Sequence, residues 1–412
     1  MSDWVEADLM YWDDKILRVA EDLGLDWHPI DYEIIDYQEM LGAMAYTGLP
    51  THYRHWSYGK EYERTHTLYN MGQTGLPYEM IINSNPSIAY LMRENALSVH
   101  ILTMAHCVGH SDFFKNNRMF ADTNPNNIID SFKSATKYVR QLIEDPSIGI
   151  ERVEKILDAA HSIKYQVPRY PGIKYKTRAE LLQLEKKKMT QDPAYVPNLS
   201  KTPLEPEYNL LRFIAEHSKN LEEWERNLIL IVEESSRYFI PQALTKIMNE
   251  GWACTLHYKI INELNLPDSL HLPFIKLHNQ VVRPHLGQLN PYHLGFKLFD
   301  KIIDEQGFEE AMMVREVHND ISYLDEKFMK DMNYFSYSFK KENKNITIDD
   351  ISDDEGWENI RDELIKNVGL NRVPVVFVDE VEKDNSLCIR HEHDGRDLDL
   401  AYGKKVFEYI ET

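Results

Sequence analysis

The chain has 412 residues, of which 43% are apolar, 27% charged and 11% aromatic, a composition typical of a globular protein with a substantial core. Its formal net charge of −21 argues against a function that depends on neutralising nucleic-acid phosphates. No apolar run approaches the ~20 residues that cross a bilayer, the N-terminus does not resemble a secretory signal, and the three cysteines are too far apart in sequence to suggest a disulfide framework. We therefore expect a cytoplasmic protein that neither binds nucleic acid nor spans a membrane.

The first region, residues 1–164, is predicted to be mainly helical. Residues 25–34 and 78–85 are expected to be extended, and the aromatic stretch 48–60, which Gly and Pro interrupt, is expected to form a loop. Pro86, behind the cap-like Asn85, is predicted to open a long helix that ends near Lys115. Apolar residues at three- and four-residue spacing predict further helices over residues 4–24, 37–46, 61–71, 126–144 and 148–164.

Residues 165–206 contain six prolines, with one predicted helix, Arg178–Met189, between them. This composition suits either a linker or a surface excursion of the chain. Helical periodicity returns over residues 207–332, with helices predicted over 208–218, 222–238, 242–264, 290–305 and 317–332.

The last part, residues 333–412, changes character. Its predicted order is β-β-α-β-β-α, with strands over 334–339, 345–348, 373–379 and 386–393 and helices over 355–367 and 398–410. That order suggests a small α+β domain. The expected fold class is therefore α+β and predominantly α-helical, a large helical body with a small C-terminal α+β domain.

Two histidines on the long predicted helix, His106 and His110, are the first candidate metal ligands. Their four-residue spacing places both imidazoles on one helix face, one turn apart. In the hydrolytic version of this pattern, His-Glu-x-x-His, the glutamate is the general base, but here Cys107 occupies that position. Cys107 could be a thiolate ligand or a nucleophile, although a cysteine on an apolar helix is more often buried and inert.

Glu250, on the helix predicted over 242–264, is the third candidate ligand. Its surroundings are mostly apolar, so its carboxylate needs a cation, a metal or a hydrogen-bond partner. Two histidines on one helix and a glutamate on a later helix are the ligand set of a large class of zinc hydrolases. The alternatives are that the histidines cap or bridge polar groups in a helical core, and that Glu250 forms a salt bridge with a histidine or an arginine.

Further residues are candidates for catalysis or substrate binding. In the absence of a helix glutamate, the candidate proton carriers are Glu94, Asp112 and His257. The candidate substrate-binding residues are Arg54, His55, Asn249 and Trp252. Other histidines that could contribute are His52, His285, His293, His391 and His393. For the last two, we favour the solvent-facing side of a strand over a ligand pair.

The chain resembles the SpoVR family, the stage V sporulation protein R group, from about residue 10 to residue 410. The segments that carry the resemblance are Gly48-Leu-Pro-Thr, His55-Trp-Ser-Tyr-Gly-Lys, Tyr78-Glu, Ile82-Asn-Ser-Asn-Pro, Ala105-His-Cys-Val-Gly-His-Ser-Asp-Phe-Phe-Lys-Asn-Asn, Glu223-Trp-Glu-Arg, Tyr238-Phe-Ile-Pro-Gln, Met248-Asn-Glu-Gly-Trp-Ala, Asn290-Pro-Tyr-His-Leu-Gly, Val314-Arg-Glu-Val and His391-Glu-His-Asp-Gly. Separately, Ala105-His-Cys-Val-Gly-His and Glu250-Gly-Trp-Ala are similar to ligand motifs of His-Glu-x-x-Gly-His metallopeptidases, except at Cys107.

The family resemblance implies a cytoplasmic protein linked to sporulation and spore cortex formation where the host sporulates. It also implies partners, because relatives are often encoded beside a PrkA-type serine kinase and a von Willebrand A-domain protein. Two hypotheses follow. The first is a hydrolase that binds Zn²⁺ or another divalent transition metal through His106, His110 and Glu250 and acts on a peptide or a peptidoglycan precursor. The second is a non-catalytic regulator or adaptor that acts with those partners.

Overall fold

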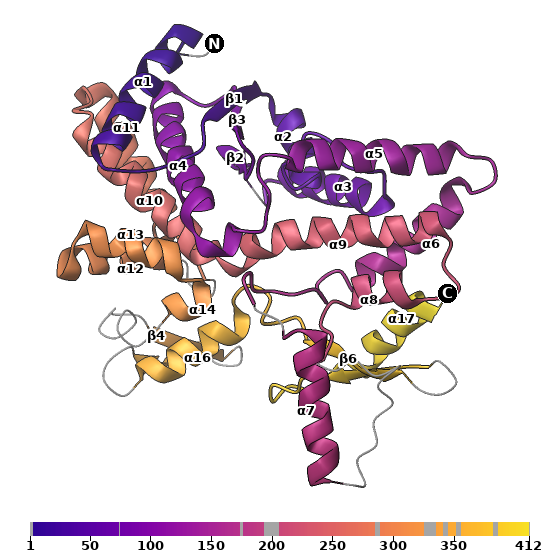
Figure 1. The fold of residues 1–412 in the computed structure, drawn as a ribbon. Helices are drawn as coiled ribbons and strands as arrows, with labels where there is room; N and C mark the ends of the chain where they lie inside the picture. The colour runs from indigo at the N-terminus through magenta and orange to yellow at the C-terminus, as the bar shows by residue number, and fades with distance from the viewer. Residues whose placement is uncertain are drawn as a thin grey trace. The chain divides into compact units, whose positions relative to one another are not determined.

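The computed structural model describes residues 3–73, 75–173, 176–192, 206–284, 289–324, 335–340, 345–351, 356–381 and 386–411. Helices dominate this part of the chain, and its strands form small sheets of two or three strands (Figure 1). The expected class, α+β and predominantly α-helical, is therefore confirmed. The C-terminal order β-β-α-β-β-α is also present, with β4 paired to β5 and β6 paired to β7.

The chain divides into two compact units, each made of two separate stretches of sequence. Unit 1 comprises Met1–Thr136 and Gln242–Gly369, and unit 2 comprises Lys137–Pro241 and Leu370–Thr412. The four contiguous ranges expected from the sequence, 1–164, 165–206, 207–332 and 333–412, stay a prediction about domains.

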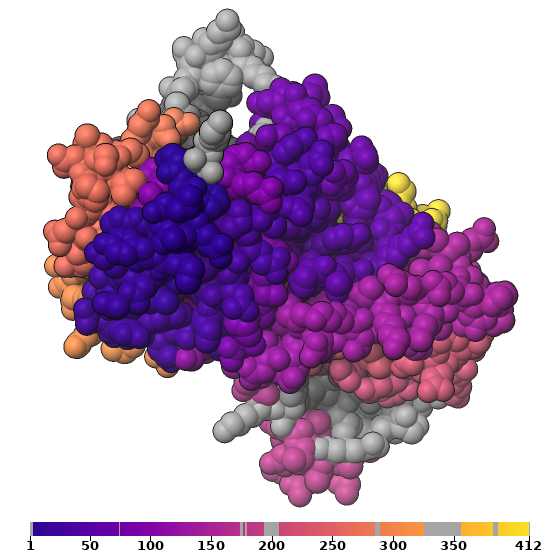
Figure 2. All heavy atoms as spheres, turned by 90° about the horizontal axis from the view of Figure 1, so that it is seen from above, coloured from indigo at the N-terminus to yellow at the C-terminus, as the bar shows by residue number. Residues whose placement is uncertain are grey.

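Unit 1 contains the elements that build the site. Its helices are α1 (Glu6–Asp22), α2 (Tyr37–Ala45), α3 (Trp56–Asn70), α4 (Leu97–Asn116), the 3₁₀ helix η1 (Arg118–Phe120), α10 (Lys246–Glu263), α11 (Asp268–Val281), α12 (Pro291–Gln306), α13 (Phe308–Val317), α14 (Asp320–Tyr323) and α16 (Trp357–Asn367). Its strands are β1 (Ile30–Ile35), β2 (Glu79–Ile82), β3 (Ser87–Met92), β4 (Phe335–Lys340) and β5 (Asn345–Ile351). On the face seen in Figure 2, the N-terminal residues (indigo) lie beside the salmon and orange residues of the second stretch.

The sheet of unit 1 has the strand order β1-β3-β2, so β2 is an edge strand. The central strand β3 pairs in parallel with β1 and antiparallel with β2. The carbonyl of Tyr78 accepts a hydrogen bond from the N–H of Met92. Backbone hydrogen bonds alternate along an antiparallel pair, so the residues of β2 that bond to β3 are the even-numbered ones. The N–H and C=O groups of Glu79 and Ile81 therefore point away from β3, toward the free edge.

In the core of unit 1, α10 packs against α4 and against α12. All the residues of α4 from His100 to Phe114 are buried, so this helix is covered on every side. Glycines permit the close packing: a Cβ added to Gly109 of α4 would lie 2.7 Å from the Cα of Ala253 of α10, and one added to Gly251 of α10 would lie 2.3 Å from the carbonyl carbon of Gly295 of α12. Larger side chains at these contacts would force the helices apart.

A distant carboxylate completes the N-terminus of α10. Asp320 of α14 accepts hydrogen bonds from the N–H groups of Ile247 and Met248, each at 2.9 Å. These N–H groups have no partner within the helix, so the carboxylate satisfies them as a capping side chain would. The first turn of the helix that carries Glu250 is thereby held in place.

Unit 2 contains α6 (Gly149–Ser162), α7 (Arg178–Gln191), α8 (Leu210–His217), α17 (Leu400–Glu411) and the antiparallel strands β6 (Val376–Val381) and β7 (Leu387–His391). The boundary between the units falls within α5 (Ile128–Glu144) and α9 (Glu223–Leu244). Within unit 2, α17 packs against α6, and Glu207 forms an isolated bridge with Val378.

Several predicted elements were wrong in their bounds. The helix expected from Pro86 begins only at Leu97, because residues 87–92 form the central strand β3. The expected loop 48–60 ends early, since α3 begins at Trp56. The predicted helices 222–238 and 242–264 leave a break at Pro241, whereas α9 contains Pro241 and continues to Leu244.

The sequence prediction also missed two helices, α11 and α13. Of the helix expected over residues 317–332, the structure describes α14, while residues 325–332 lie outside the described part. The polar residues Lys383-Asp-Asn predict a turn between the strands 373–379 and 386–393, and residues 383–385 also lie outside the described part.

Candidate metal and substrate site

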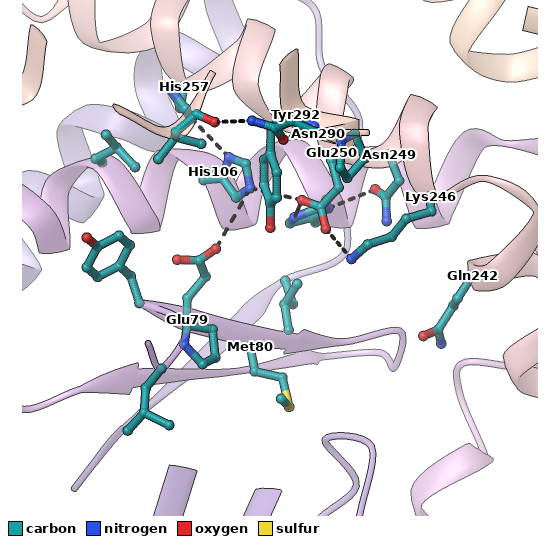
Figure 3. A pocket seen from close by; sticks show the side chains of 18 of the residues that line it. Glu79, Met80, His106, Gln242, Lys246, Asn249, Glu250, His257, Asn290 and Tyr292 are labelled. Atoms are coloured by element: carbon teal, nitrogen blue, oxygen red, sulfur yellow. Dashed lines mark hydrogen bonds and ion pairs between the residues drawn. The ribbon is translucent and has the colours of Figure 1, made fainter. Parts of the chain in front are cut away.

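A cavity of about 650 Å³ lies within unit 1 between β2 and the helices α4, α10 and α12 (Figure 3). Its lining includes six consecutive residues, Leu76 to Ile81, which end in β2. Side chains of a strand alternate between its faces, so a consecutive run of lining residues indicates that the cavity extends along the edge of the strand.

His106 and His110 of α4 and Glu250 of α10 come together in this cavity. The Nε2 atoms of His106 and His110 lie 3.6 and 3.4 Å from Glu250 Oε2. All three side chains are buried, and their donor atoms lie within 4.8 Å of one another. Such a group of two imidazoles and a carboxylate could hold a metal ion.

The other ring nitrogen of each histidine is held by a residue of α10. His110 Nδ1 donates to Asn249 Oδ1 at 2.8 Å, and His106 Nδ1 is 3.0 Å from His257 Nδ1. A proton on Nδ1 of His110 leaves its Nε2 with a lone pair. His106 Nε2 is buried and makes no hydrogen bond in the described part of the chain. These contacts orient both Nε2 atoms as outer partners orient the ligands of a metal.

Glu250 is held in its charged form in the cavity. Burial acts to raise the pKa of this carboxyl, but Lys246 and the two histidines outweigh burial and hold the pKa well below its ordinary value. Lys246 Nζ lies 2.6 Å from Glu250 Oε1. Burial acts to lower the pKa of His110, but the hydrogen bonds with Glu250 and Asn249 and the charge of Glu250 outweigh burial and raise this pKa overall. The carboxylate thus favours positive charge beside it.

Tyr292, at the start of α12, covers one side of the group. Its ring lies against that of His106, with centroids 6.3 Å apart and planes at 26°. The charge of Glu250, followed by burial, raises the pKa of the Tyr292 hydroxyl well above its ordinary value. The hydroxyl therefore keeps its proton and can donate a hydrogen bond inside the cavity.

Glu79 is a site residue that the sequence reasoning missed. It projects from β2 toward α4, and its Oε1 is 3.8 Å from His106 Nε2 (Figure 3). Burial raises the pKa of its carboxyl. The available signal was a single acidic residue in a short apolar run, 78–82, because a carboxylate inside a buried strand needs a specific partner.

A second group of possible donors shares His106 with the first. It contains Cys254 and His257 of α10, both buried. Burial raises the pKa of the Cys254 thiol well above its ordinary value, which disfavours the thiolate that binds metals. His257 Nε2 is 2.8 Å from His278 Nδ1, so its ring bridges two other imidazoles. The group with Glu250 is therefore the better metal site.

Two predicted site residues, Asp112 and Trp252, contact each other away from the cavity. Trp252 Nε1 donates to Asp112 Oδ2 at 2.8 Å, and Arg315 Nη1 lies 3.3 Å from the same oxygen. Both residues are fully buried, and neither lines the cavity. In this position the pair links α4 to α10.

The remaining predicted residues also lie elsewhere. Glu94 is exposed in the turn before α4 because the predicted helix does not extend that far back. Arg54 is exposed, and buried His55 caps α3 by accepting a hydrogen bond from the N–H of Ser57. None of the three lines the cavity. Cys107 is fully buried beside His106 and does not line it either.

The other histidines have separate surroundings. His52 contacts the hydroxyl of Tyr58, and His293 Nδ1 donates to the carbonyl of Val282. His391 and His393, with rings 5.7 Å apart, form no metal-binding group with the other described residues. His285 lies outside the described residues.

Comparison with known proteins identifies the family. Within the described residues, no helix has the length and apolar character needed to cross a membrane. No solved structure matches the chain significantly. The uncharacterized protein YcgB of Escherichia coli (strain K12) is 34% identical over 451 aligned residues, which cover 96% of this chain and 88% of that protein. A family model described as SpoVR like protein matches residues 3–373, a range that contains every residue of the site. The chain therefore belongs to the SpoVR family.

Proposed function

We propose that the protein is a metal-dependent hydrolase whose metal ligands are His106, His110 and Glu250. The observation that carries the proposal is the convergence of three buried donors, two of them oriented through their other ring nitrogens. Two imidazoles and a carboxylate suit Zn²⁺ or another divalent transition metal. Among the described residues, the buried Nε2 of His106 makes no hydrogen bond, which fits this ligand role because a buried polar atom without a hydrogen bond is costly.

A divalent metal at this position would polarise a scissile carbonyl and lower the pKa of a water molecule. The residues around it have separate tasks. Asn249 and His257 hold the two histidines in the required orientation. Lys246 balances the negative charge of Glu250, and Tyr292 offers a hydroxyl proton to an oxygen that becomes negative during the reaction.

A peptide chain is the substrate that the cavity suits best. The free edge of β2 presents the N–H and C=O groups of Glu79 and Ile81, and the cavity extends along that edge. An extended peptide can pair with such an edge through its own backbone. Apolar lining residues, such as Met80, Leu102 and Phe114, could accept its side chains.

The resemblance to sporulation proteins narrows the substrate further. Spore cortex is built from peptidoglycan, so a peptide-bearing peptidoglycan precursor is the candidate we favour. Such precursors are made in the cytoplasm, where we propose that the protein acts.

A second function is favoured by Cys107, which stands where a helix glutamate would act as base. Burial raises the pKa of its thiol well above the ordinary value, so this side chain cannot take over that task. The protein would then be a non-catalytic regulator with a structural metal, acting with a PrkA-type serine kinase and a von Willebrand A-domain partner.

Elemental analysis of the purified full-length chain tests the metal site. We expect one divalent transition metal per chain, and we expect His106→Ala and Glu250→Gln to lose it. His217→Ala and Glu216→Gln are matched controls, because both residues are exposed on α8. Absence of metal from the wild type, or retention of metal in both site variants, would overturn the proposal.

Activity separates the two functions. We expect the metal-loaded protein to release amines from peptidoglycan stem peptides, and the two site variants to release none. Metal at full occupancy without hydrolysis of these peptides would favour the regulator.

A further inference from the structure

Two elements place an acidic side chain in the cavity, and only one of these side chains is a proposed metal ligand. Among the described residues that line the cavity, the acidic ones are Glu79 and Glu250. Glu250 contacts both histidines and is paired with Lys246. The other carboxylates considered as bases lie outside the cavity: Asp112 is bound to Trp252, and Glu94 is exposed.

Glu79 approaches the three proposed metal ligands from the opposite side to α10. It extends from β2, whereas Glu250 extends from α10, and the imidazole of His106 lies between the two elements (Figure 3). Glu79 Oε1 is 3.8 Å from His106 Nε2, but Glu79 is not in the set whose donor atoms lie within 4.8 Å of one another. It is therefore beside the ligand set and outside it. This is the place of a group that handles a water molecule next to the metal.

The strand fixes the backbone from which this carboxylate extends. Glu79 is paired with Leu91 of β3, which is the central strand of its sheet. Its neighbour Met80 faces Gly48, since a Cβ added to that glycine would lie 3.0 Å from Met80 Sδ. Because side chains alternate along a strand, Glu79 is directed to the other face, toward α4. A fixed position of this kind is what a catalytic base requires.

We propose that Glu79 is the general base of this site and replaces the helix glutamate whose position Cys107 occupies. The proposal rests on the proposed function, a metal-dependent hydrolase. The carboxylate would come from an edge strand that also lines the substrate cavity, so one element would supply both the base and the docking edge.

The step balances with the groups present. Glu79 takes a proton from a water molecule, whose oxygen lone pair forms a bond to the carbonyl carbon of the substrate. The π electrons move to the carbonyl oxygen. When the carbonyl re-forms, the C–N bond breaks, and Glu79 returns its proton to the departing amine nitrogen. Water and an amide are consumed, a carboxyl group and an amine are formed, and no redox partner is needed.

The test uses the full-length chain loaded with Co²⁺ and acetohydroxamic acid as the probe. Hydroxamates chelate such metals and place a proton where a base carboxylate accepts it. We expect Glu79→Gln to bind as much Co²⁺ as the wild type and to bind acetohydroxamic acid about 10- to 100-fold more weakly, the loss typical of a hydrogen bond to a charged group. Glu33→Gln is the matched control, because Glu33 is exposed on β1 of the same sheet.

Each result has a distinct meaning. Equal hydroxamate affinity in the wild type and Glu79→Gln would overturn the role of Glu79 alone. Loss of Co²⁺ from a folded Glu79→Gln, checked by circular dichroism, would make Glu79 a ligand and overturn its role as base. If Glu79→Gln does not fold, Glu79→Asp replaces it, and unchanged hydroxamate affinity in that shortened variant counts against the proposal. A wild type that binds no Co²⁺ would overturn the proposed function itself.

Discussion

His106 and His110 each use one ring nitrogen to contact a neighbour on α10 and turn the other toward Glu250. The sequence predicted the two histidines and Glu250 as ligands, because helical spacing is a local property. It did not predict which residues orient the two imidazoles. Asn249, predicted to bind substrate, and His257, predicted to carry protons, both contact the histidines directly, and those two roles stay predictions.

His100, in the first half of α4, provides a pH-dependent test of the fold that is independent of the metal site. It is fully buried, its ring nitrogens have no hydrogen-bond partner among the described residues, and its ring packs edge-on against Trp4. Burial lowers the pKa of His100 from 6.5 to about 4, although Asp3 acts in the opposite direction. The unfolded chain therefore binds this proton more readily than the folded chain does.

We predict that the contribution of His100 to stability is present above pH 6.5 and is lost as the pH falls from there toward 4. Between pH 7 and pH 5 the loss should be about 1–2 kcal/mol, allowing for solvent screening. In His100→Leu this loss should disappear. Urea denaturation at both pH values measures it, and an equal loss in the variant would contradict the prediction.

At the scale of elements, the site depends on how closely α4, α10 and α12 pack. The sequence contains a glycine, Gly251, beside the buried carboxylate of Glu250, and Gly251 is in close contact with Gly295 of α12. The sequence did not indicate which helix would approach, because that depends on the tertiary arrangement. The same limit explains β3: its apolar run suits a helix or a strand, and pairing with β1 and β2 decides between them.

Gly251→Ala tests this packing. The added Cβ would lie 2.3 Å from the Gly295 backbone, so the helices must separate, at a cost of about 3 kcal/mol. Gly42→Ala is the control, because a Cβ on that helical glycine meets nothing within 4 Å and should stabilise α2 by about 0.5–1 kcal/mol. Free energies of unfolding from urea denaturation decide the matter. Similar values for the two variants would show that the contact is not tight.

At the scale of the whole molecule, the proposed ligands come from two stretches of unit 1 that are separated in the sequence by residues 137–241 of unit 2. His106 and His110 belong to the first stretch and Glu250 to the second. A metal that binds all three would stabilise the folded arrangement of unit 1, because the unfolded chain does not hold these groups together.

We therefore expect removal of the metal by a chelator to lower the midpoint of thermal unfolding. At a free metal concentration one hundred times the dissociation constant, binding contributes about 2.7 kcal/mol, which corresponds to a shift of about 5–10 °C for a unit of this size. Differential scanning calorimetry with Zn²⁺ and with chelator measures the shift. His106→Ala should show none, and a shift of equal size in that variant would point to a different binding site.

The sequence by itself determined the fold class, most of the helices and three residues that converge in the cavity. Those features depend on periodicity and spacing along one element, which the residues of that element carry. The tertiary structure decided the rest. It brought Glu79 from an edge strand to His106, and it paired Asp112 with Trp252 away from the cavity. It also showed that Glu94 precedes the helix on which it was expected to lie. Contacts between side chains from distant segments depend on which elements pack together, and no local pattern contains that information.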